Sequence, residues 1–512
     1  MFENIIIGIN MMFSLGNFFA ALVGVTIGMF FGAIPGFNDI IAIILILPFT
    51  YYINPIASIA MLMGCSKGAN FGGSIPAILF NVPGTTQAKV TSFDGYPLTK
   101  KGQSEKALKV ALYASTIADT ASDFILFFLA APVSILALMV GPPEYAMIIL
   151  FSILIIGLVG SEDLVKGMIS IGIGMLLSTI GMDPTIGSLR FTFGSLELSS
   201  GISLVSLGLG LFVISESFLQ LESCIMDKKI KSSKKIDKVT QFKKVDQMND
   251  QHLSKKEFRR CIRPIINGIG IGSLMGAIPG IGTTVASYLS YARTKNTSKH
   301  PELFGKGAIE GIAAAEAGNN ACVGPNLIPL ITLGVPGNMA AAIILGAFMI
   351  QGLTPGPLFM QQNAPMLYGL FTLLIISNVF TFSVGSLFVR YCKNLAYIPK
   401  QILYPLVLVF TVVGTYIFNY SMFDVVLLFP LGIFGYVLTK INIPIPPLVI
   451  AFILGSIFET RLRQALIISA GSISPFFTHP ISLIFLSASI LTIAFYIIKK
   501  KQQRASKIDN VL

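Results

Sequence analysis

A proline-glycine pattern occurs twice in this chain, each time in the same order. GAIPG spans 32–36 and IPAILFNVPG spans 75–84; GAIPG recurs at 276–280 and IPLITLGVPG follows at 328–337. The first motif recurs after 244 residues and the second after 253, which is explained by one insertion of 9 residues between them. Because proline and glycine interrupt helices, the pattern predicts two homologous halves with backbone breaks at equivalent places.

The composition places these breaks inside a membrane. Hydrophobic residues make up 54% of the chain and charged residues 12%, against about 25% charged residues in soluble domains. Apolar runs at 17–34, 124–140 and 481–498 are long enough, or nearly so, to cross a hydrocarbon core of about 30 Å. We therefore expect an all-α polytopic membrane protein with about 11 to 14 membrane segments.

Basic residues indicate how the chain is oriented. The stretch 226–260 carries 12 of the 36 lysines and arginines; this is typical of a cytoplasmic linker, and binding to anionic membrane lipids is the alternative. The basic tail around 499–504 is expected inside as well, whereas the N-terminus, with no basic residue before Lys67, is expected outside. The net charge of +12 is thus explained without a nucleic-acid partner.

Two pairs of equivalent loops have opposite charge patterns. In the first half, 50–54 is uncharged and 85–106 carries four lysines; in the second half, 293–306 carries four basic residues and 352–365 is uncharged. This reversal predicts two inverted-topology repeats with broken or hairpin helices. The predicted parts are a first membrane repeat, a basic cytoplasmic linker, a second and inverted membrane repeat, and an extra span with a cytoplasmic tail, at 1–225, 226–261, 262–475 and 476–512.

The apolar segments predict a series of elements in each half. A hairpin-like element at 57–82 is expected to break around Gly68, Gly72 and Gly73, and 85–106 is expected to be a polar loop. The other helices predicted in the first half are 17–34, 40–50, 107–140, 145–159, 165–180 and 202–221. Those of the second half are 265–278, 283–291, 311–335, 367–388, 403–417, 423–438 and 447–458, with an extra span at 481–498.

Broken helices at matching points of two inverted halves point to a substrate site near the membrane midplane. Freed N–H groups attract anions, and freed carbonyls suit Na⁺. The residues predicted to bind substrate are Ser74, Asn81, Gly84, Thr85, Thr86, Asn320, Gly337 and Asn338. Those predicted to couple transport to an ion are Pro35, Gly36, Asp39, Pro279, Gly280, Glu316 and Asn319. The alternative is that glycine and proline are simply common in membrane helices.

Ionisable residues inside a membrane are costly and therefore mark functional candidates. Asp39 and Lys67 could pair with each other, in a structural or a coupling role. Asp119 and Asp123 share a helix face, lack basic neighbours in sequence and are expected to face water. The carbonyl-rich breaks favour Na⁺ as the coupling ion, whereas H⁺ would need a titrating carboxylate such as Asp39 or Glu316.

Several other kinds of site are not indicated. The three histidines and five cysteines form no metal-ligand or disulfide pattern. No phosphate-binding loop of the Walker type points to ATP. We therefore expect no cofactor apart from a coupling Na⁺ or H⁺.

Six segments carry a family resemblance: PGFNDIIAIILILPFT, GANFGGSIPAILFNVPGTT, FDGYPLTKKGQSEKAL, SKHPELFGKGAIEGIAAAEAGNNA, LIPLITLGVPGN and GLTPGP. They resemble TctA, the large membrane subunit of tripartite tricarboxylate transporters. The resemblance implies a secondary-active permease subunit, in a bacterial inner membrane, that imports a small organic anion of the tri- or dicarboxylate type. It also implies two partners, a small TctB-like membrane subunit and a periplasmic TctC-like solute-binding protein.

Three positions depart from the usual pattern of that family. Lys67 stands where relatives generally have a neutral or aromatic residue, and Asn38-Asp39 where small or hydroxyl residues are usual. His479-Pro480 replaces a more common Arg-Pro. The first two departures lie near the predicted site and bear on the substrate and the coupling ion.

Two other classes of protein stay open from the sequence alone. An anion channel would be indicated by a solute-free conductance. An intramembrane aspartyl protease would need two aspartates on different helices, and Asp39 with Asp119 could be forced into that role, but no matching catalytic motifs accompany them. We therefore expect a transport protein and not an enzyme.

Overall fold

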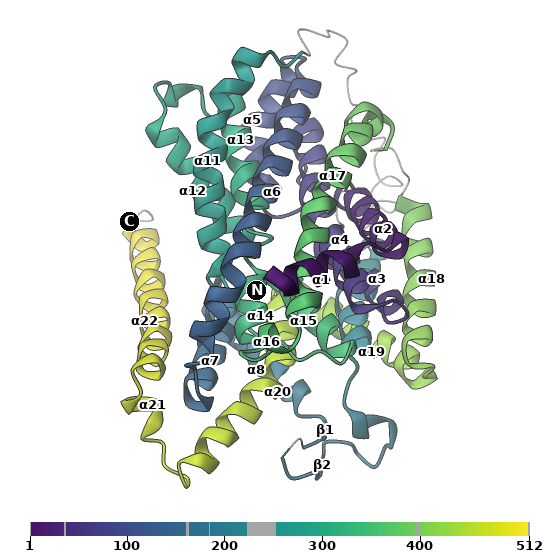
Figure 1. The fold of residues 1–512 in the computed structure, drawn as a ribbon, viewed down its shortest axis with the longest axis vertical. Helices are drawn as coiled ribbons and strands as arrows, with labels where there is room; N and C mark the ends of the chain where they lie inside the picture. The colour runs from purple at the N-terminus through teal and green to yellow at the C-terminus, as the bar shows by residue number, and fades with distance from the viewer. Residues whose placement is uncertain are drawn as a thin grey trace.

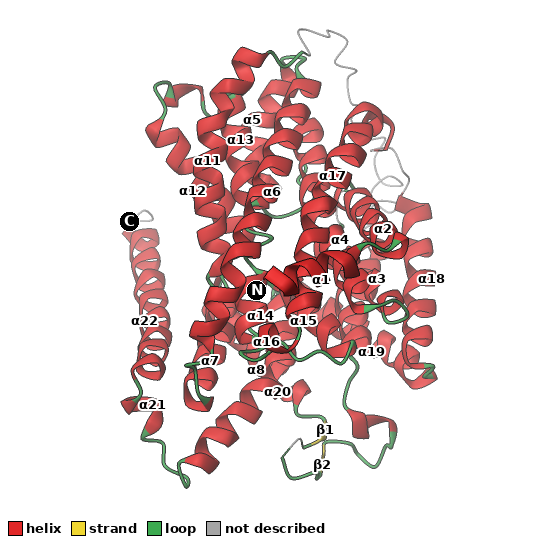
Figure 2. Ribbon diagram, viewed as in Figure 1, coloured by secondary structure: helices red, strands yellow, loops and turns green. Residues whose placement is uncertain are grey.

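The computed structural model describes residues 2–34, 37–159, 163–183, 185–222, 252–395 and 400–509. Most of the long helices run along the longest axis of the molecule (Figure 1), and nearly every element is a helix (Figure 2). The described residues contain one small sheet, in which β1 (Gly181–Met182) pairs antiparallel with β2 (Leu189–Arg190). The predicted all-α class is confirmed.

The elements of the first half follow the order expected from the apolar runs. They are α1 (Phe2–Met12), α2 (Leu15–Gly32), α3 (Asp39–Thr50), α4 (Pro55–Phe80), α5 (Ala88–Lys100), α6 (Ser104–Ala137), α7 (Pro142–Val159), α8 (Leu164–Ser178), β1, β2, the 3-10 helix η1 (Glu197–Ser200), α9 (Leu204–Gly208) and the π-helical stretch η2 (Leu209–Ile214).

The second half begins at Lys255, inside the range predicted for the linker; residues 226–251 of that linker lie outside the described residues. Its elements are α11 (Lys255–Ala277), α12 (Gly282–Thr297), η3 (Pro301–Leu303), α13 (Ile309–Asn320), α14 (Leu327–Leu333), α15 (Met339–Ile350), α16 (Phe359–Gln362), α17 (Ala364–Leu395), α18 (Lys400–Asn419), α19 (Met422–Lys440), α20 (Ile445–Ile468), α21 (Pro475–Thr478) and α22 (Pro480–Asp509).

Six helices in the described part of the chain are long and apolar enough to cross a membrane: 15–32, 104–137, 204–222, 364–391, 422–440 and 445–468. Shorter apolar helices, such as α3 and α15, lie between them. Half-length helices of this kind are what broken spans would produce. The prediction of a polytopic membrane protein is confirmed.

Two local predictions for the first half are wrong. The element around the three glycines is a single unbroken helix, α4, and the predicted polar loop at 85–106 contains α5. The glycines of α4 serve close packing: a Cβ at Gly68 or Gly72 would overlap the backbone of α2 at Val25 or Met29. Glycine was read as a helix breaker, but here it lets two helix backbones touch.

The same close packing recurs in the second half at the offsets found in the sequence. In the first half Gly28 lies against the carbonyl of Cys65, and in the second half Gly272 lies against the carbonyl of Gly318. A second pair of contacts obeys the same two offsets, Gly32 against Ala69 and Gly276 against Cys322. The pairs α2–α4 and α11–α13 are therefore equivalent in structure as well as in sequence.

α4 and its counterpart in the second half, α13 with α14, run in opposite directions. They also differ in one respect. Pro325 stands where α4 has Gly72, and the second-half helix is interrupted there between α13 and α14 because proline lacks the N–H that a helix needs. The C-terminal end of α4 contacts the end of α5. Just after α5, Lys101 Nζ lies 2.7 Å from the carbonyl oxygen of Lys306, just before α13 begins. The end of α4 and the start of α13 therefore lie at the same end of the molecule.

The two uncharged loops likewise lie together. Gln351 lies immediately before the uncharged loop 352–365, and Thr50 is the first residue of the uncharged loop 50–54. Gln351 Nε2 donates to the carbonyl of Thr50 at 2.8 Å. The basic loops thus share one end and the uncharged loops share another region, as an inverted repeat would place them. Which side of a membrane each end faces stays a prediction.

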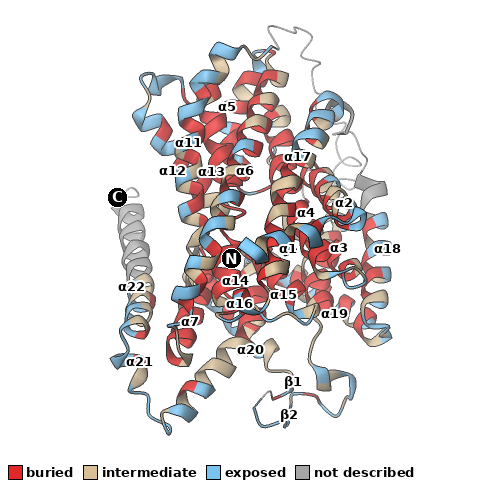
Figure 3. Ribbon diagram, viewed as in Figure 1, coloured by how far each residue is buried: buried red, intermediate tan, exposed pale blue. Residues whose placement is uncertain are grey.

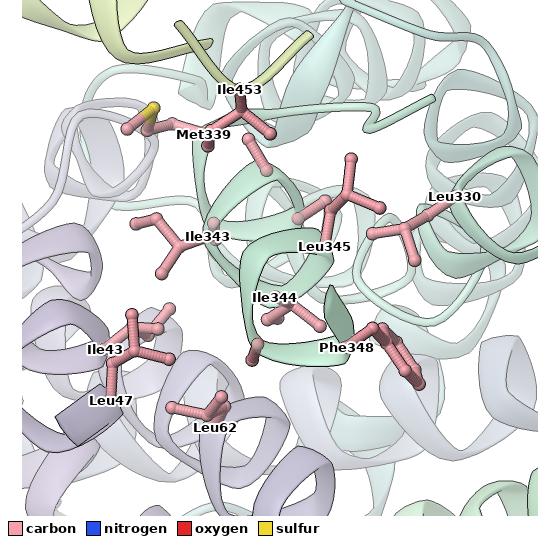
Figure 4. Close-up of a cluster of buried hydrophobic side chains, with 14 of the residues drawn as sticks. Ile43, Leu47, Leu62, Leu330, Met339, Ile343, Ile344, Leu345, Phe348 and Ile453 are labelled. Carbon is pink, nitrogen blue, oxygen red and sulfur yellow. The ribbon is translucent and has the colours of Figure 1, made fainter. Parts of the chain in front are cut away.

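Much of the interior is buried (Figure 3), and one large apolar cluster in it is organised around α15 (Figure 4). Every residue of this helix from Met339 to Phe348 is buried. Its side chains meet α3, α4, α14 and α20, which surround it in the close-up (Figure 4). The sequence analysis did not predict α15, although its apolar run of 12 residues matches that of α3, which was predicted.

Candidate functional site

Each Ile-Pro…Pro-Gly frame ends a helix in the same way. The N–H of Val82 donates to the carbonyl of Pro76 at 3.3 Å, and the N–H of Val335 donates to the carbonyl of Pro329 at 3.2 Å. The residue before each valine is left-handed, Asn81 in the first copy (φ 58°) and a glycine in the second. Asn81 is exposed and its conformation is that of a helix cap, so its presence is explained without a ligand.

The glycine of each Pro-Gly packs against the first glycine of the GAIPG motif in its own half. A Cβ at Gly84 would overlap the carbonyl oxygen of Gly32, and one at Gly337 would lie 3.3 Å from that of Gly276. The N–H of Gly84 also donates to the carbonyl of Gly73 at 3.1 Å. The two broken segments of each half are therefore in direct backbone contact.

Breaks from the two halves also meet each other. The hydroxyl of Thr86, just after the first Pro-Gly, lies 3.2 Å from that of Thr284, just after the second GAIPG. The N–H of Gly280 (φ 86°) donates to the carbonyl of Gly337 at 3.0 Å. Asn338 follows at once and caps α15 by accepting a 2.8 Å hydrogen bond from its first turn. Three of the four breaks thus form one continuous region.

A buried carboxylate lies at the junction of the halves. Glu316 of α13 is fully buried, and its oxygens accept hydrogen bonds from Ser74 at 2.5 Å, Ser115 at 2.9 Å and Thr91. All three donors belong to the first half. No lysine, arginine or histidine among the described residues forms an ion pair with this carboxylate, so neutral donors stabilise it: the three hydroxyl groups and, at 3.4 Å, the amide of Asn320.

Asn320 and Asn319 follow Glu316 on the same helix and differ in their contacts. The amide of Asn320 donates to Ser115 Oγ and to the backbone carbonyl of Glu316, both at 2.9 Å. Asn319 is 1% exposed, and neither atom of its amide has a partner in the described residues. The buried hydroxyl of Thr85 is also unpartnered there. Buried polar groups are nearly always hydrogen-bonded, so the predicted roles of Asn319 and Thr85 in ligand binding stay predictions that agree with their unpartnered state.

Some residues of this region were not predicted. Thr91 and Ser115 contact Glu316 directly, and Gln87 Nε2 donates to Asn70 Oδ1 at 2.5 Å between buried side chains. Thr91 was missed because its segment was taken for a loop. Ser115 had a usable signal, since it is a polar residue four positions before Asp119 in a long apolar helix.

A second buried carboxylate ties the halves together without belonging to the breaks. Asp94 Oδ1 accepts from the N–H groups of Gly305, Gly307 and Ala308, each at 2.8 Å, and Asp94 Oδ2 accepts from Tyr291 Oη at 2.9 Å. The aspartate of the FDGYP segment therefore holds the chain that leads into α13. Its geometry is that of a structural anchor.

Two predictions about charged residues are wrong. Lys67 pairs with Asp119 and Asp123, not with Asp39. Neither of these two aspartates faces water, because they are 2% and 0% exposed. Packing of α4 and α17 against α6 buries them, which sequence spacing along a single helix could not reveal.

The remaining predicted ion-coupling residues are placed as follows. Asp39 is the first residue of α3, and the preceding Asn38 caps this helix by accepting from the Ile41 N–H at 2.9 Å. Pro279 lies in the turn between α11 and α12. Pro35 and Gly36 lie outside the described residues.

A polytopic helical protein whose interrupted helices meet at a buried polar junction belongs to the class of membrane transport proteins. This chain is a member of the tripartite tricarboxylate transporter TctA family, which matches residues 18–450. The family contributes a component of a transporter and is not an enzyme family.

Two relatives from Agrobacterium vitis are similar to the chain. One, described as "Uncharacterized 52.8 kDa protein in TAR-I ttuC' 3'region", is 34% identical over 492 residues, 96% of this chain and 95% of the relative. The other, described as "Uncharacterized protein in TAR-II ttuC' 3'region", is 35% identical over 237 residues, 46% of this chain and 98% of the relative. No solved structure matches the chain.

Proposed function

We propose that this chain is the permease subunit of a secondary-active importer for a small organic anion of the tri- or dicarboxylate type. It works in a bacterial inner membrane with a TctB-like small membrane subunit and a TctC-like periplasmic binding protein, as membership of the family suggests. The linker and the C-terminus lie in the cytoplasm.

The observation that carries this proposal is the meeting of backbone breaks from both halves. Thr86 of the first half contacts Thr284 of the second, and the Gly280–Gly337 contact joins two breaks within the second half, so a solute held there touches both halves at once. Glycines let a solute carboxylate approach main-chain N–H groups. Asn319, in the second half, offers a buried amide that has no partner among the described residues. Movement of one half against the other would then change which side reaches the solute.

The charge of the solute requires a coupling cation, Na⁺ or H⁺. Moving one negative charge into a negative-inside cell costs about 2.3 kcal/mol at 100 mV. A di- or trianion cannot be accumulated against this potential unless cations enter with it. Glu316 is the predicted coupling carboxylate that lies at the junction of the halves, where it accepts hydrogen bonds from Ser74 and Ser115 of the first half.

Two measurements test the proposal. First, the binding protein encoded beside this chain is screened by thermal shift against a panel containing citrate, succinate and malate, and stabilisation by one of them is expected. Second, the complete complex is reconstituted in proteoliposomes and counterflow of that radiolabelled carboxylate is measured. Stabilisation by no carboxylate, or an anion conductance without counterflow, would contradict the proposed permease and in the second case indicate a channel.

A further inference from the structure

A second buried polar cluster lies where α4, α6 and α17 meet. Its members are Lys67, Asp119, Asp123 and Asn378, which are 0%, 2%, 0% and 3% exposed. Each lies near the middle of a helix of 26 residues or more, far from both helix ends. Ionisable residues at such depth in a membrane protein are costly and mark a functional site by default.

The contacts in this cluster are uneven. Lys67 Nζ donates to Asp123 Oδ2 and, at 2.9 Å, to Asn378 Oδ1. The Asn378 amide donates to the same Asp123 oxygen at 2.7 Å. Asp119 Oδ1 accepts no hydrogen bond from the described residues, because it lies 3.3 Å from Lys67 Nζ without hydrogen-bond geometry. Asp123 is thus held by two donors and Asp119 by one longer contact.

The charges of the cluster do not balance. Two carboxylates on α6 face one ammonium on α4, while α17 contributes the neutral Asn378 and the turn after α13 contributes only backbone. Among the described residues, no other charged side chain forms an ion pair with these three groups. With all of them ionised the site carries one net negative charge, which is expensive to bury. It therefore needs one added positive charge when closed to water.

Two oxygen atoms are free to receive that charge. Asp119 Oδ1 and Asp123 Oδ1 are buried and accept no hydrogen bond from the described residues. Asp123 Oδ1 would lie 2.8 Å from a Cβ built on Gly324, so it faces the interruption between α13 and α14. The charged site therefore borders a backbone break of the second half.

A proton fits this site better than a metal cation. Lys67 Nζ already lies among the two carboxylates and the amide oxygen, where a cation would otherwise be placed. Sodium would also need several more oxygen ligands, as cations of its kind are held by cages of oxygens. Asp123 is stabilised as an anion by its two donors, so the proton goes to Asp119.

We propose that Asp119 carries the coupling proton, with Lys67 and Asp123 as a fixed ion pair beside it. This deepens the proposed function and rests on it, and it replaces the sodium preference expected from the backbone breaks. In the step itself Asp119 carboxylate takes one H⁺ from the outside, which makes the cluster neutral, and gives it up as H⁺ on the inside. No electrons are transferred, and each cycle carries one proton inward together with the carboxylate, so a dianion enters with one net negative charge instead of two.

The proton site is joined to the Glu316 junction by one face of α6. Ser115, Asp119 and Asp123 follow each other at intervals of four, so they lie along the same face of the helix. Ser115 contacts Glu316 at one end of this row, and Asp123 contacts Lys67 at the other. The offset of 253 that relates Pro76 to Pro329 also relates Lys67 to Asn320. The two polar clusters thus occupy equivalent positions in the two halves.

The test uses the complete complex in proteoliposomes and the carboxylate identified with the binding protein. A gradient of about one pH unit supports about tenfold accumulation per proton. We expect wild type to show this accumulation and an inward proton flux on an internal pH-sensitive dye. Asp119→Asn keeps the cluster neutral, so it should retain counterflow but lose the pH-driven accumulation and the proton flux. Asp424→Asn, a buried aspartate in α19, is the matched control and should behave as wild type.

A spectroscopic readout separates proton binding from a structural role. In the purified full-length chain, infrared difference spectra between acid and alkaline pH contain a carbonyl band from each carboxyl group that becomes protonated, and one of these bands should belong to Asp119. That band should be missing in Asp119→Asn and shifted in Asp119→Glu, but keep its position in Asp123→Glu. Carbonyl bands of Asp119→Asn that are identical to those of wild type would overturn the proposal.

The outcomes also separate this proposal from the proposed function. If counterflow occurs but accumulation follows a Na⁺ gradient at fixed pH and survives in Asp119→Asn, the permease stands and the proton assignment is wrong. If no carboxylate shows counterflow, the permease is contradicted, and the infrared titration still decides whether Asp119 binds a proton.

Discussion

The hydroxyl of Ser74 donates a 2.5 Å hydrogen bond to the carboxylate of Glu316, and the two residues belong to different halves of the chain. Ser74 lies one residue before the Ile-Pro of the first half, and Glu316 lies in α13 of the second. Both groups are fully buried, so water does not compete for this hydrogen bond in the structure. If the halves move against each other in transport, as proposed above, the hydrogen bond must be exchanged for another contact.

Removal of the Ser74–Glu316 hydrogen bond should reveal an interaction free energy between the two halves of the chain. Ser74→Ala should destabilise the protein by about 1–3 kcal/mol, since it leaves a buried carboxylate with one donor fewer. In a double-mutant cycle with Glu316→Gln the two effects should not be additive. Unfolding in mixed micelles gives both values. Ser152→Ala, whose hydroxyl bonds only to its own helix at 2.8 Å, is the control; strict additivity of Ser74→Ala and Glu316→Gln would show that the contact is energetically idle.

The Pro-Gly glycines should be sensitive to a single methyl group. Gly84→Ala would drive a Cβ into the carbonyl of Gly32, and Gly337→Ala would press on Asn326. Because these contacts hold the breaks together, we expect both variants to lose most carboxylate uptake at a similar membrane level of protein. Gly270→Ala and Gly172→Ala add a methyl group in open space and should transport normally. Normal uptake by both Gly84→Ala and Gly337→Ala would mean that the breaks do not act in transport.

The basic loops of the two halves lie together, so we expect both of them on the same side of the membrane. Lys101 contacts Lys306, so Lys100 and Lys299 should both be cytoplasmic, and Asn54 and Asn363 periplasmic. Single cysteines at these positions, in a chain freed of its native cysteines, should react with an impermeant maleimide in whole cells only at 54 and 363. Periplasmic labelling at 100 or 299 would refute the inverted arrangement.

The sequence predicted most of the long helices and the breaks at the Pro-Gly motifs, but it did not predict α5 or α15 and it predicted a break in α4 that is absent. Long apolar runs and paired Pro-Gly motifs are local signals, and proline acts on its own helix wherever it stands. The break at Pro279-Gly280 was predicted from residue type alone, whereas the interruption at Pro325 lies inside the single element predicted at 311–335. Glycine is different, because Gly68 and Gly72 acquire their role only from the neighbouring helix.

The partners of buried charges could not be predicted from the sequence. Lys67 lies 52 positions before Asp119 and 311 before Asn378, and only the packing of three helices brings them together. Glu316 and Asn320 were recognised because they stand beside a break. Their donor Thr91 was not, because its contact with Glu316 depends on how α5 folds back along α4.

The last prediction concerns pH and the start of the second half. Burial alone would raise the pKa of Glu257, but hydrogen bonds from Lys106 and from the N–H and hydroxyl of Ser254 outweigh it and lower the pKa to about 2. A lowered pKa stabilises the folded state above the usual glutamate range near 4.5, and this gain is lost as the pH falls towards 2. Solvent screening at this partly exposed site limits the gain to about 1 kcal/mol.

Glu257→Gln should therefore lower the melting temperature at pH 6, and the difference from wild type should shrink steadily between pH 4.5 and 2. Thermal unfolding in detergent across that range measures both. Glu302→Gln is the control, because this glutamate is 61% exposed and pairs only with His300 among the described residues; it should change little at any pH. A difference between Glu257→Gln and wild type that stays constant down to pH 2 would show that the loss comes from packing or helix capping, and that the charge of Glu257 contributes nothing.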